Sequence, residues 1–116
     1  MYFVSIAGMT DAIVAELRAM SRAAFGQSYR LEVMLAVADA EDGLVNLTDL
    51  ARTLDLPTSN VQNPLKSLVT LALISEAPSG DSKRKHYLRN PSHAWDWAWE
   101  MRAAAQAAVT TAPIDH

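Results

Sequence analysis

Cysteine is absent from the 116 residues of the chain. The absence excludes disulfides, thiolate metal ligands and cysteine nucleophiles, and it fits a reducing cytoplasm, where we expect the protein to be located. The sequence has no run near the ~18 apolar residues of a membrane span. Its start, MYFVSIAG, lacks the charged region of a signal peptide. We therefore expect no membrane segment and no signal peptide.

The common motifs of enzymes are missing as well. The sequence contains no glycine-rich phosphate loop, no His-Glu-x-x-His and no serine in a nucleophile-elbow context. We therefore expect neither an enzyme nor a bound cofactor. What is present is enough for one folded domain with a modest core, because 50% of the residues are hydrophobic.

The most informative stretch runs from residue 46 to residue 73. Apolar residues recur there with helical spacing and predict a short first helix: Leu47, Leu50, Ala51 and Leu54. Thr48 is placed to cap this helix, and Asp49 suits its positive end. After a break at residues 55–57, a second apolar set predicts another helix: Val61, Leu65, Leu68 and Ala72. Two short helices joined by a tight turn predict a helix-turn-helix unit.

Pro64 leaves two interpretations of the second helix. In the helix interior it removes the hydrogen bond to the Asn60 carbonyl and kinks the chain, at a cost of ~3 kcal/mol if uncompensated. Alternatively, Asn63 caps a helix that begins at Pro64, and residues 58–62 form a turn. We favour the continuous helix because Val61 extends the apolar stripe toward Leu65.

A basic hairpin follows the two helices. Residues 74–77 and 85–89 are strand-like, and residues 44–46 are branched enough to form a small strand that pairs with this hairpin, or wing. Between residues 56 and 89, five basic residues against Glu76 and Asp81 give a charge of +3. The whole chain carries −3, so the remainder carries −6. Such a polarised surface suits phosphate binding.

The candidate DNA contacts lie on the second helix and the wing. Basic side chains that can each neutralise a phosphate are Lys66, Lys83, Arg84 and Lys85, with His86 beside them. Amides that can pair with adenine edges are those of Asn60, Gln62 and Asn63, while Thr58 and Ser59 can reach bases or backbone. The alternative for each of them is a polar side chain that is merely solvated.

Two further helices flank this unit. Thr10 and Asp11 open a helix over residues 10–25, whose apolar stripe is Ile13, Leu17, Met20 and Ala24 and whose far side carries Ala12, Ala15, Ala19 and Ala23. Gly26 ends it. Ser28 is placed to cap the next helix, which is apolar around much of its girth and should be the most buried. We expect residues 1–9 to form an N-terminal arm, either extended or a frayed tail, and residues 110–116 to form a flexible tail. Ser92 is placed to cap a last helix over 92–109.

The last helix divides its aromatic residues between two faces. Trp95 and Trp99 lie together with Ala98 and Arg102, whereas Trp97 and Met101 point to nearly the opposite side. Only one face can cover the domain's own core, so the other predicts a second copy of the chain. We expect a homodimer built on residues 10–25 and 92–109 through Ile13, Leu17, Met20, Trp95, Trp97, Trp99 and Met101. The alternative is that all three tryptophans share one intramolecular core.

Taken together, these segments resemble the ArsR-type winged-helix transcriptional regulators of bacteria. The resemblance runs over residues 20–89 and is carried by three segments: FGQSYRLEVML at 25–35, LTDLA at 47–51 and VQNPLK at 61–66, with a hairpin that closes on HYL at 86–88. It implies a mainly α fold with a small β-hairpin wing: two helices, a short strand, two helices, two strands and a last helix. It also implies dimerisation and binding to double-stranded DNA, and it leaves the effector open. MarR-like regulators share the unit but usually have longer chains.

The chain departs from the metal-sensing members of that family. Residues 47–54 contain no cysteine pair, and on the last helix His93 with Asp96 imitates only half of the family's zinc site. We therefore expect no metal site. The sequence predicts a sequence-specific DNA-binding regulator, a dimeric repressor in particular. The alternative is a winged-helix module that binds an acidic protein partner instead of DNA.

Overall fold

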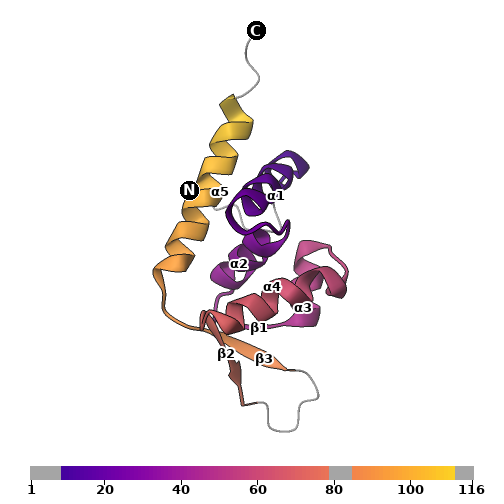
Figure 1. Ribbon diagram of the computed structural model, residues 1–116, viewed down its shortest axis with the longest axis vertical. Coiled ribbons are helices and arrows are strands. Elements are labelled where there is room, and N and C mark those ends of the chain that lie inside the picture. The colour runs from indigo at the N-terminus through magenta and orange to yellow at the C-terminus, as the bar shows by residue number, and fades with distance from the viewer. Residues whose placement is uncertain (1–8, 79–84, 112–116) are drawn as a thin grey trace.

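The computed structural model describes residues 9–78 and 85–111 (Figure 1). Its elements follow in this order: α1 (Asp11–Phe25), α2 (Arg30–Asp39), β1 (Leu44–Asn46), α3 (Leu47–Leu54), α4 (Thr58–Thr70), β2 (Ile74–Ala77), β3 (His86–Arg89) and α5 (His93–Thr111). The order confirms the predicted fold class, a mainly α chain with a small β-hairpin wing. The predicted helix 92–109 runs two residues further, to Thr111. None of the described helices is both long and apolar enough to cross a membrane.

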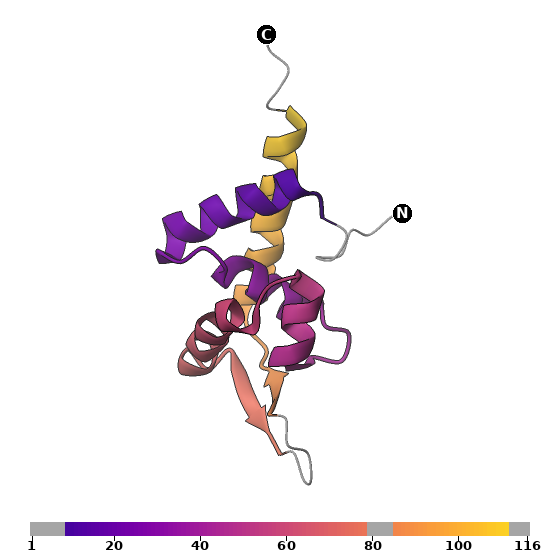
Figure 2. The ribbon, with the colours of Figure 1, turned by 90° about the vertical axis from the view of Figure 1, so that its right-hand side faces the viewer.

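Helix α2 lies at the centre of the molecule, as its sequence predicts. Every residue from Leu31 to Ala38 is buried, and α2 contacts α1, α3, α4 and α5. One of these buried residues is charged: Glu32 is only 2% exposed. In the turned view, α1 crosses α5 above the α3–α4 pair, and the strands project on the far side of that pair (Figure 2). Helix α1 and the C-terminal part of α5 therefore lie on the side of the molecule away from the wing (Figure 2).

The three strands form one antiparallel sheet in the order β1-β3-β2. Leu44 pairs with Leu88, and Ile74 pairs with Arg89. The pairing confirms that residues 44–46 join the wing. Because β1 leads directly into α3, it ties the wing to the start of the helix-turn-helix.

Three predicted helix ends, at Thr10, Gly26 and Ser92, are confirmed, and two caps are wrong. Ser92 Oγ accepts from the Ala94 backbone N–H at 3.0 Å at the start of α5. Thr10 Oγ1 accepts from the Ile13 backbone N–H at 3.3 Å, and Gly26 ends α1 at a φ of 71°. Helix α3, however, is capped by Asn46, whose Oδ1 accepts from the backbone N–H of Asp49 at 2.9 Å. Thr48 lies inside the helix because α3 begins at Leu47.

The second error concerns the start of α2. Its first flanking residue is Tyr29, which makes no capping bond through its side chain. Ser28 lies one residue too early to cap, and its Oγ instead accepts from Arg22 Nη1 at 3.2 Å. The Ser21 hydroxyl, which is fully buried, accepts from the Leu31 backbone N–H at 3.1 Å. A side chain from α1 therefore satisfies a free N–H at the start of α2.

Helix α4 is continuous through Pro64, so the first interpretation of this proline is correct. The ring of Pro64 is fully buried beside Val61 and Leu68 on the core side of the helix. Burial of the ring offsets part of the cost of the missing backbone hydrogen bond. The residues before Pro64 therefore stay helical and present their polar side chains on the same surface as Lys66.

Candidate nucleic-acid interface

The outer face of α4 is polar and exposed. Its apolar positions, Val61, Leu65 and Leu68, pack into the core. The exposed positions include five of the six candidate contacts on the helix: Thr58, Ser59, Gln62, Asn63 and Lys66. Asn60, the sixth, is half-buried at the edge of this face. The structure thus brings the predicted contacts of α4 to one surface that faces solvent.

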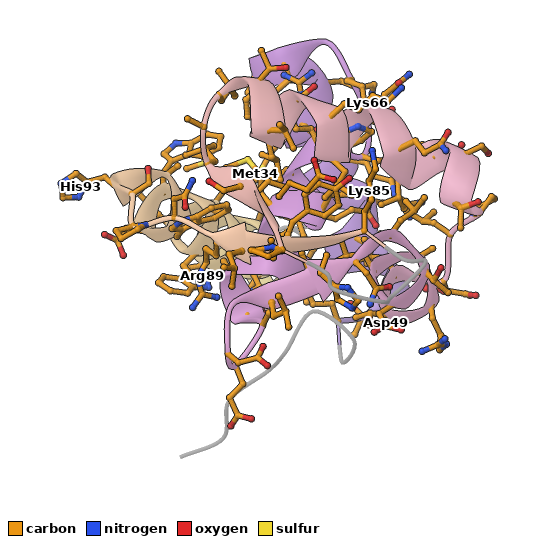
Figure 3. All side chains as sticks on the ribbon, turned by 90° about the horizontal axis from the view of Figure 1, so that it is seen from below. Met34, Asp49, Lys66, Lys85, Arg89 and His93 are labelled. Carbon is orange, nitrogen blue, oxygen red and sulfur yellow. The ribbon has the colours of Figure 1, made fainter. Side chains whose placement is uncertain are left out.

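A groove of about 640 Å³ separates α4 from the wing. Gln62, Lys66 and Val69 line it from α4, and Lys85 and Tyr87 line it from the wing side. In the view from below, Lys66 and Lys85 lie near each other, and His93 lies far from both on α5 (Figure 3). Lys85 Nζ is 3.9 Å from Glu76 Oε2, but both side chains are more than half exposed. A pair of this kind contributes little to stability and leaves the lysine able to bind another anion.

The opposite flank of α4 carries a second groove, of about 390 Å³, that sequence reasoning missed. Its lining joins Arg30 at the start of α2 to Asn63, Lys66, Ser67, Thr70 and Leu71 of the α4 segment. Arg30 Nη2 donates to Ser67 Oγ at 2.8 Å, and the guanidinium carbon lies 5.0 Å from the centre of the Phe25 ring. Only the packing of α2 against α4 could reveal this cation, because residues 30 and 67 are far apart in the chain.

The charge count made from the sequence needs one correction on the wing. Arg89 Nη1 donates to the carbonyl oxygens of Val37, Ala38 and Ala40, at 2.8–2.9 Å. Its charge therefore stabilises the C-terminal end of α2 and is not offered to a phosphate. His86 is half-buried on β3. Lys83 and Arg84, both predicted phosphate contacts, lie outside the described residues.

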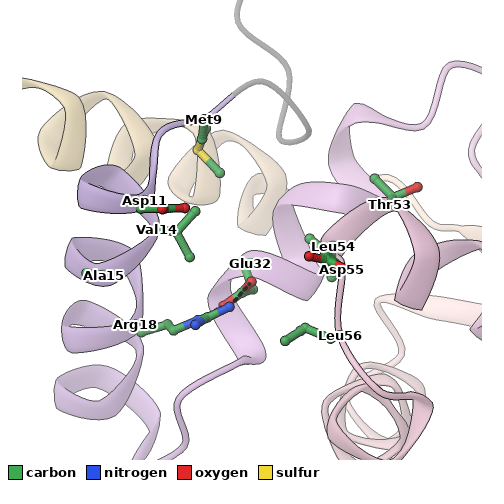
Figure 4. A pocket seen from close by; sticks show the side chains of 10 residues that line it. All are labelled: Met9, Asp11, Val14, Ala15, Arg18, Glu32, Thr53, Leu54, Asp55 and Leu56. Atoms are coloured by element: carbon green, nitrogen blue, oxygen red, sulfur yellow. Dashed lines mark hydrogen bonds and ion pairs between the residues drawn. The ribbon is translucent and has the colours of Figure 1, made fainter.

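A third cleft, of about 420 Å³, has the opposite charge. It lies between α1, α2 and the end of α3, and its lining includes Asp11, Glu32 and Asp55 but one cation, Arg18 (Figure 4). Arg18 Nε donates to Glu32 Oε1 at 2.6 Å, and Nη2 donates to Oε2 at 3.1 Å. The hydrogen bond to Glu32 raises the pKa of the Arg18 guanidinium above its usual value. This cleft is therefore not part of the candidate phosphate-binding surface.

The candidate dimer residues divide between core and surface. Leu17 is fully buried and Trp95 is 4% exposed, so both belong to the core of the single chain and cannot serve as an interface surface. The residues with surface to spare are Ile13, Met20, Trp97, Met101 and Trp99, of which Trp99 is 39% exposed. Trp97 packs edge-to-face on Phe25, with ring centres 5.7 Å apart.

The histidine on α5 lies beside an acidic side chain. His93 Nδ1 lies 3.7 Å from Asp96 Oδ2, and both side chains are exposed. Within residues 9–78 and 85–111, no three His, Cys, Asp or Glu side chains are grouped so as to hold a metal ion. That no metal controls this protein stays a prediction.

The structure is similar to that of a MarR-family transcriptional regulator from Silicibacter pomeroyi. The TM-score is 0.62, the identity is 21%, and the alignment covers 89% of this chain and 69% of the other. The chain has the winged-helix fold. Within this fold, α3 and α4 are the two helices of the helix-turn-helix, and β2 with β3 is the wing. No family model matches the sequence, and no curated protein does.

Proposed function

We propose that this winged-helix protein is a sequence-specific DNA-binding transcriptional regulator. The observation that carries the proposal is the exposed polar face of α4, where Gln62, Asn63 and Lys66 lie beside a wing that supplies Lys85. In this mode α4 is the recognition helix: it enters the major groove, its amides contact base edges, and the lysines contact phosphates.

The proposal extends to a dimeric repressor that acts in the cytoplasm. A two-fold dimer supplies two recognition helices, which is how winged-helix and helix-turn-helix regulators select paired half-sites. The narrower ArsR-type assignment is supported by sequence motifs alone, whereas the structural likeness is to a MarR-family regulator. The proposal depends only on the winged-helix unit that the two groups share.

The second candidate function is association with an acidic protein. A buried or self-paired set of polar and basic side chains would favour it, whereas Gln62, Lys66 and Lys85 line one groove. The Lys85–Glu76 pair is exposed and 3.9 Å long, so it does not neutralise that groove. Because Gln62, Lys66 and Lys85 share one groove, DNA is favoured over an acidic protein as the partner.

Duplex DNA selected from a randomised pool provides the test. Replacing Lys66 and Lys85 together by Gln should flatten the slope of log K against log salt by up to ~0.9 for each phosphate that the variant no longer neutralises. Gln62→Ala should instead cost ~1–3 kcal/mol on the selected site and little on random DNA. Arg22→Gln, which removes an exposed charge that lines neither groove, is the control. An unchanged slope in the double variant, or recovery of no preferred sequence, would contradict the proposal.

A further inference from the structure

We infer that Arg30 and Lys66 form a second phosphate site, on the flank of α4 opposite the wing, so that the recognition helix is held between the two backbones that border the major groove. The inference rests on the proposed function, DNA binding through α4. It assigns a role to Arg30, which lies outside the helix-turn-helix and outside the wing.

The two grooves lie on the two flanks of α4. At 100° per residue, Gln62 and Val69 are on the flank that faces the wing, while Asn63 and Ser67 are on the flank that faces Arg30. Lys66 lines both grooves, because it stands at the crest between them. A helix is about 10–12 Å wide with its side chains, and the major groove is about 12 Å wide. A helix seated there meets one phosphate backbone on each flank.

The chemistry of the Arg30 flank suits a phosphate. Its lining contains two cations, two hydroxyl groups and one amide, and no carboxylate among the described residues. The flank toward the wing, by contrast, includes Glu76. Of the three grooves described, the one at Arg30 therefore has the least acidic lining for its number of cations.

The guanidinium of Arg30 is already positioned at this flank. It lies over the Phe25 ring and donates to Ser67 Oγ, and that hydroxyl donates to the Asn63 carbonyl at 3.1 Å. The Nε–H of Arg30 is buried and has no acceptor within the described part of the chain. An unsatisfied buried donor is unfavourable. A phosphate oxygen at the mouth of the groove does not reach that buried Nε–H. It gives the outer N–H groups of the guanidinium a charged acceptor, and arginine–phosphate hydrogen bonds are strong.

The test measures the affinity of the protein for the selected duplex. Single phosphates of the duplex are replaced by uncharged methylphosphonates, one position at a time on both strands. The wild-type protein should lose affinity, ~10-fold, at a position on each side of the helix. Arg30→Gln should weaken binding to the unmodified duplex by a similar factor. When the phosphate that Arg30 contacts is replaced, the Arg30→Gln variant should lose little further affinity. When the phosphate on the other side is replaced, it should lose the full ~10-fold. Arg30→Lys keeps the charge without the fork and should fall between wild type and Arg30→Gln.

Arg22→Gln is the matched control, since it removes the same charge from an exposed position that lines none of the grooves. Thermal unfolding of Arg30→Gln shows whether the variant is folded. If Arg30→Gln binds like the wild type, or loses affinity without coupling to any one phosphate, the inference is wrong and the arginine has a structural role. That result leaves the proposed function intact. If the wild-type protein selects no duplex at all, both fall.

Discussion

The arginines of this chain have unlike roles that their spacing in the sequence does not distinguish. Arg18 pairs with buried Glu32, Arg89 binds the carbonyls at the end of α2, and Arg102 forms two hydrogen bonds to Asp39. The Asp39–Arg102 pair joins α2 to α5, and each side chain is at most 10% exposed. Most arginines described above thus contribute to the fold. Arg30 differs because it lies beside the exposed face of α4.

The Arg18–Glu32 pair gives a prediction about stability. The Glu32 side chain is 3% exposed and that of Arg18 is 31% exposed. Arg18→Met should therefore leave a buried carboxylate without its cation and lower the free energy of unfolding by ~2–3 kcal/mol, toward the lower end for a broken buried pair because water reaches the arginine. Urea denaturation at pH 7 measures it.

The control for that prediction removes both charges. Arg18→Met with Glu32→Met should be more stable than Arg18→Met alone, since well-packed apolar side chains often replace a buried ion pair at little cost. The single variant Glu32→Met completes the comparison. If the double variant loses as much free energy of unfolding as the two single variants together, packing volume and not the unpaired charge causes the destabilisation.

At the scale of elements, local patterns predict which helices and strands exist, and tertiary contacts decide how they end. The stripe from Leu47 to Leu54 is sufficient to predict α3, because one face of an isolated helix is enough to reveal it. The residue that caps α3, however, does not follow from the stripe. Asn46 and Thr48 are both good caps by type, and the choice falls to Asn46 because β1 pairing ends there.

The local pattern of α4 likewise predicted the part of the candidate site that lies on this helix. Gln62, Asn63 and Lys66 follow from the period of α4, which also sets their exposure. The contribution of Arg30 to this surface was not predictable, nor was the binding of Arg89 to a helix end. Both depend on which elements pack beside α2, over separations of 37 and about 50 residues.

The turn after α4 gives a prediction at this scale. Ala72 has a φ of 62°, and it lies between Leu71, the helix cap, and Leu73, whose N–H bonds to the Leu68 carbonyl at 2.9 Å. This is a Schellman end, in which glycine is the favoured residue at the left-handed position. Ala72→Gly should therefore raise the free energy of unfolding by about 0.5–1 kcal/mol.

Ala19→Gly provides the matched control, because Ala19 is exposed in the interior of α1. The same exchange should there lower the free energy of unfolding by about 1 kcal/mol. Thermal or urea unfolding of both variants measures the difference in sign. Equal destabilisation of the two variants would mean that Ala72 is not strained.

At the scale of the whole molecule, the expected dimer requires an open surface on α1 and α5. The side of α5 with Trp95, Ala98 and Arg102 is buried against the chain's own core, as one of the two expected faces must be. The other expected face is not left wholly open either, because Trp97 packs on Phe25 of α1, and Trp97 and Met101 are both partly buried against the core. Ala104, on that face, is exposed. The far side of α1 is also open, since all four of its alanines are exposed: Ala12, Ala15, Ala19 and Ala23. Side chains this small allow a partner helix to approach closely.

We therefore expect a homodimer in which the alanine side of α1 and the Met101–Ala104 flank of α5 meet their copies. Ala19→Glu and Ala104→Glu should each dissociate it with little change in helix content, because both side chains are exposed in the single chain. Sedimentation at micromolar concentration measures the dimer, and circular dichroism measures the helix. Thr53→Glu is the control: it introduces the same charge at an exposed position on α3 and should leave the dimer intact.

The same variants connect assembly to DNA recognition. A two-fold dimer sets its recognition helices about one helical turn of DNA, ~34 Å, apart, so the selected site should be roughly palindromic. Ala104→Glu should then reduce affinity for the full site to that for a single half-site, while Thr53→Glu retains the difference between them. A wild-type protein that sediments as a monomer and still binds the full site tightly would exclude the dimer, because a single recognition helix gains nothing from the second half-site.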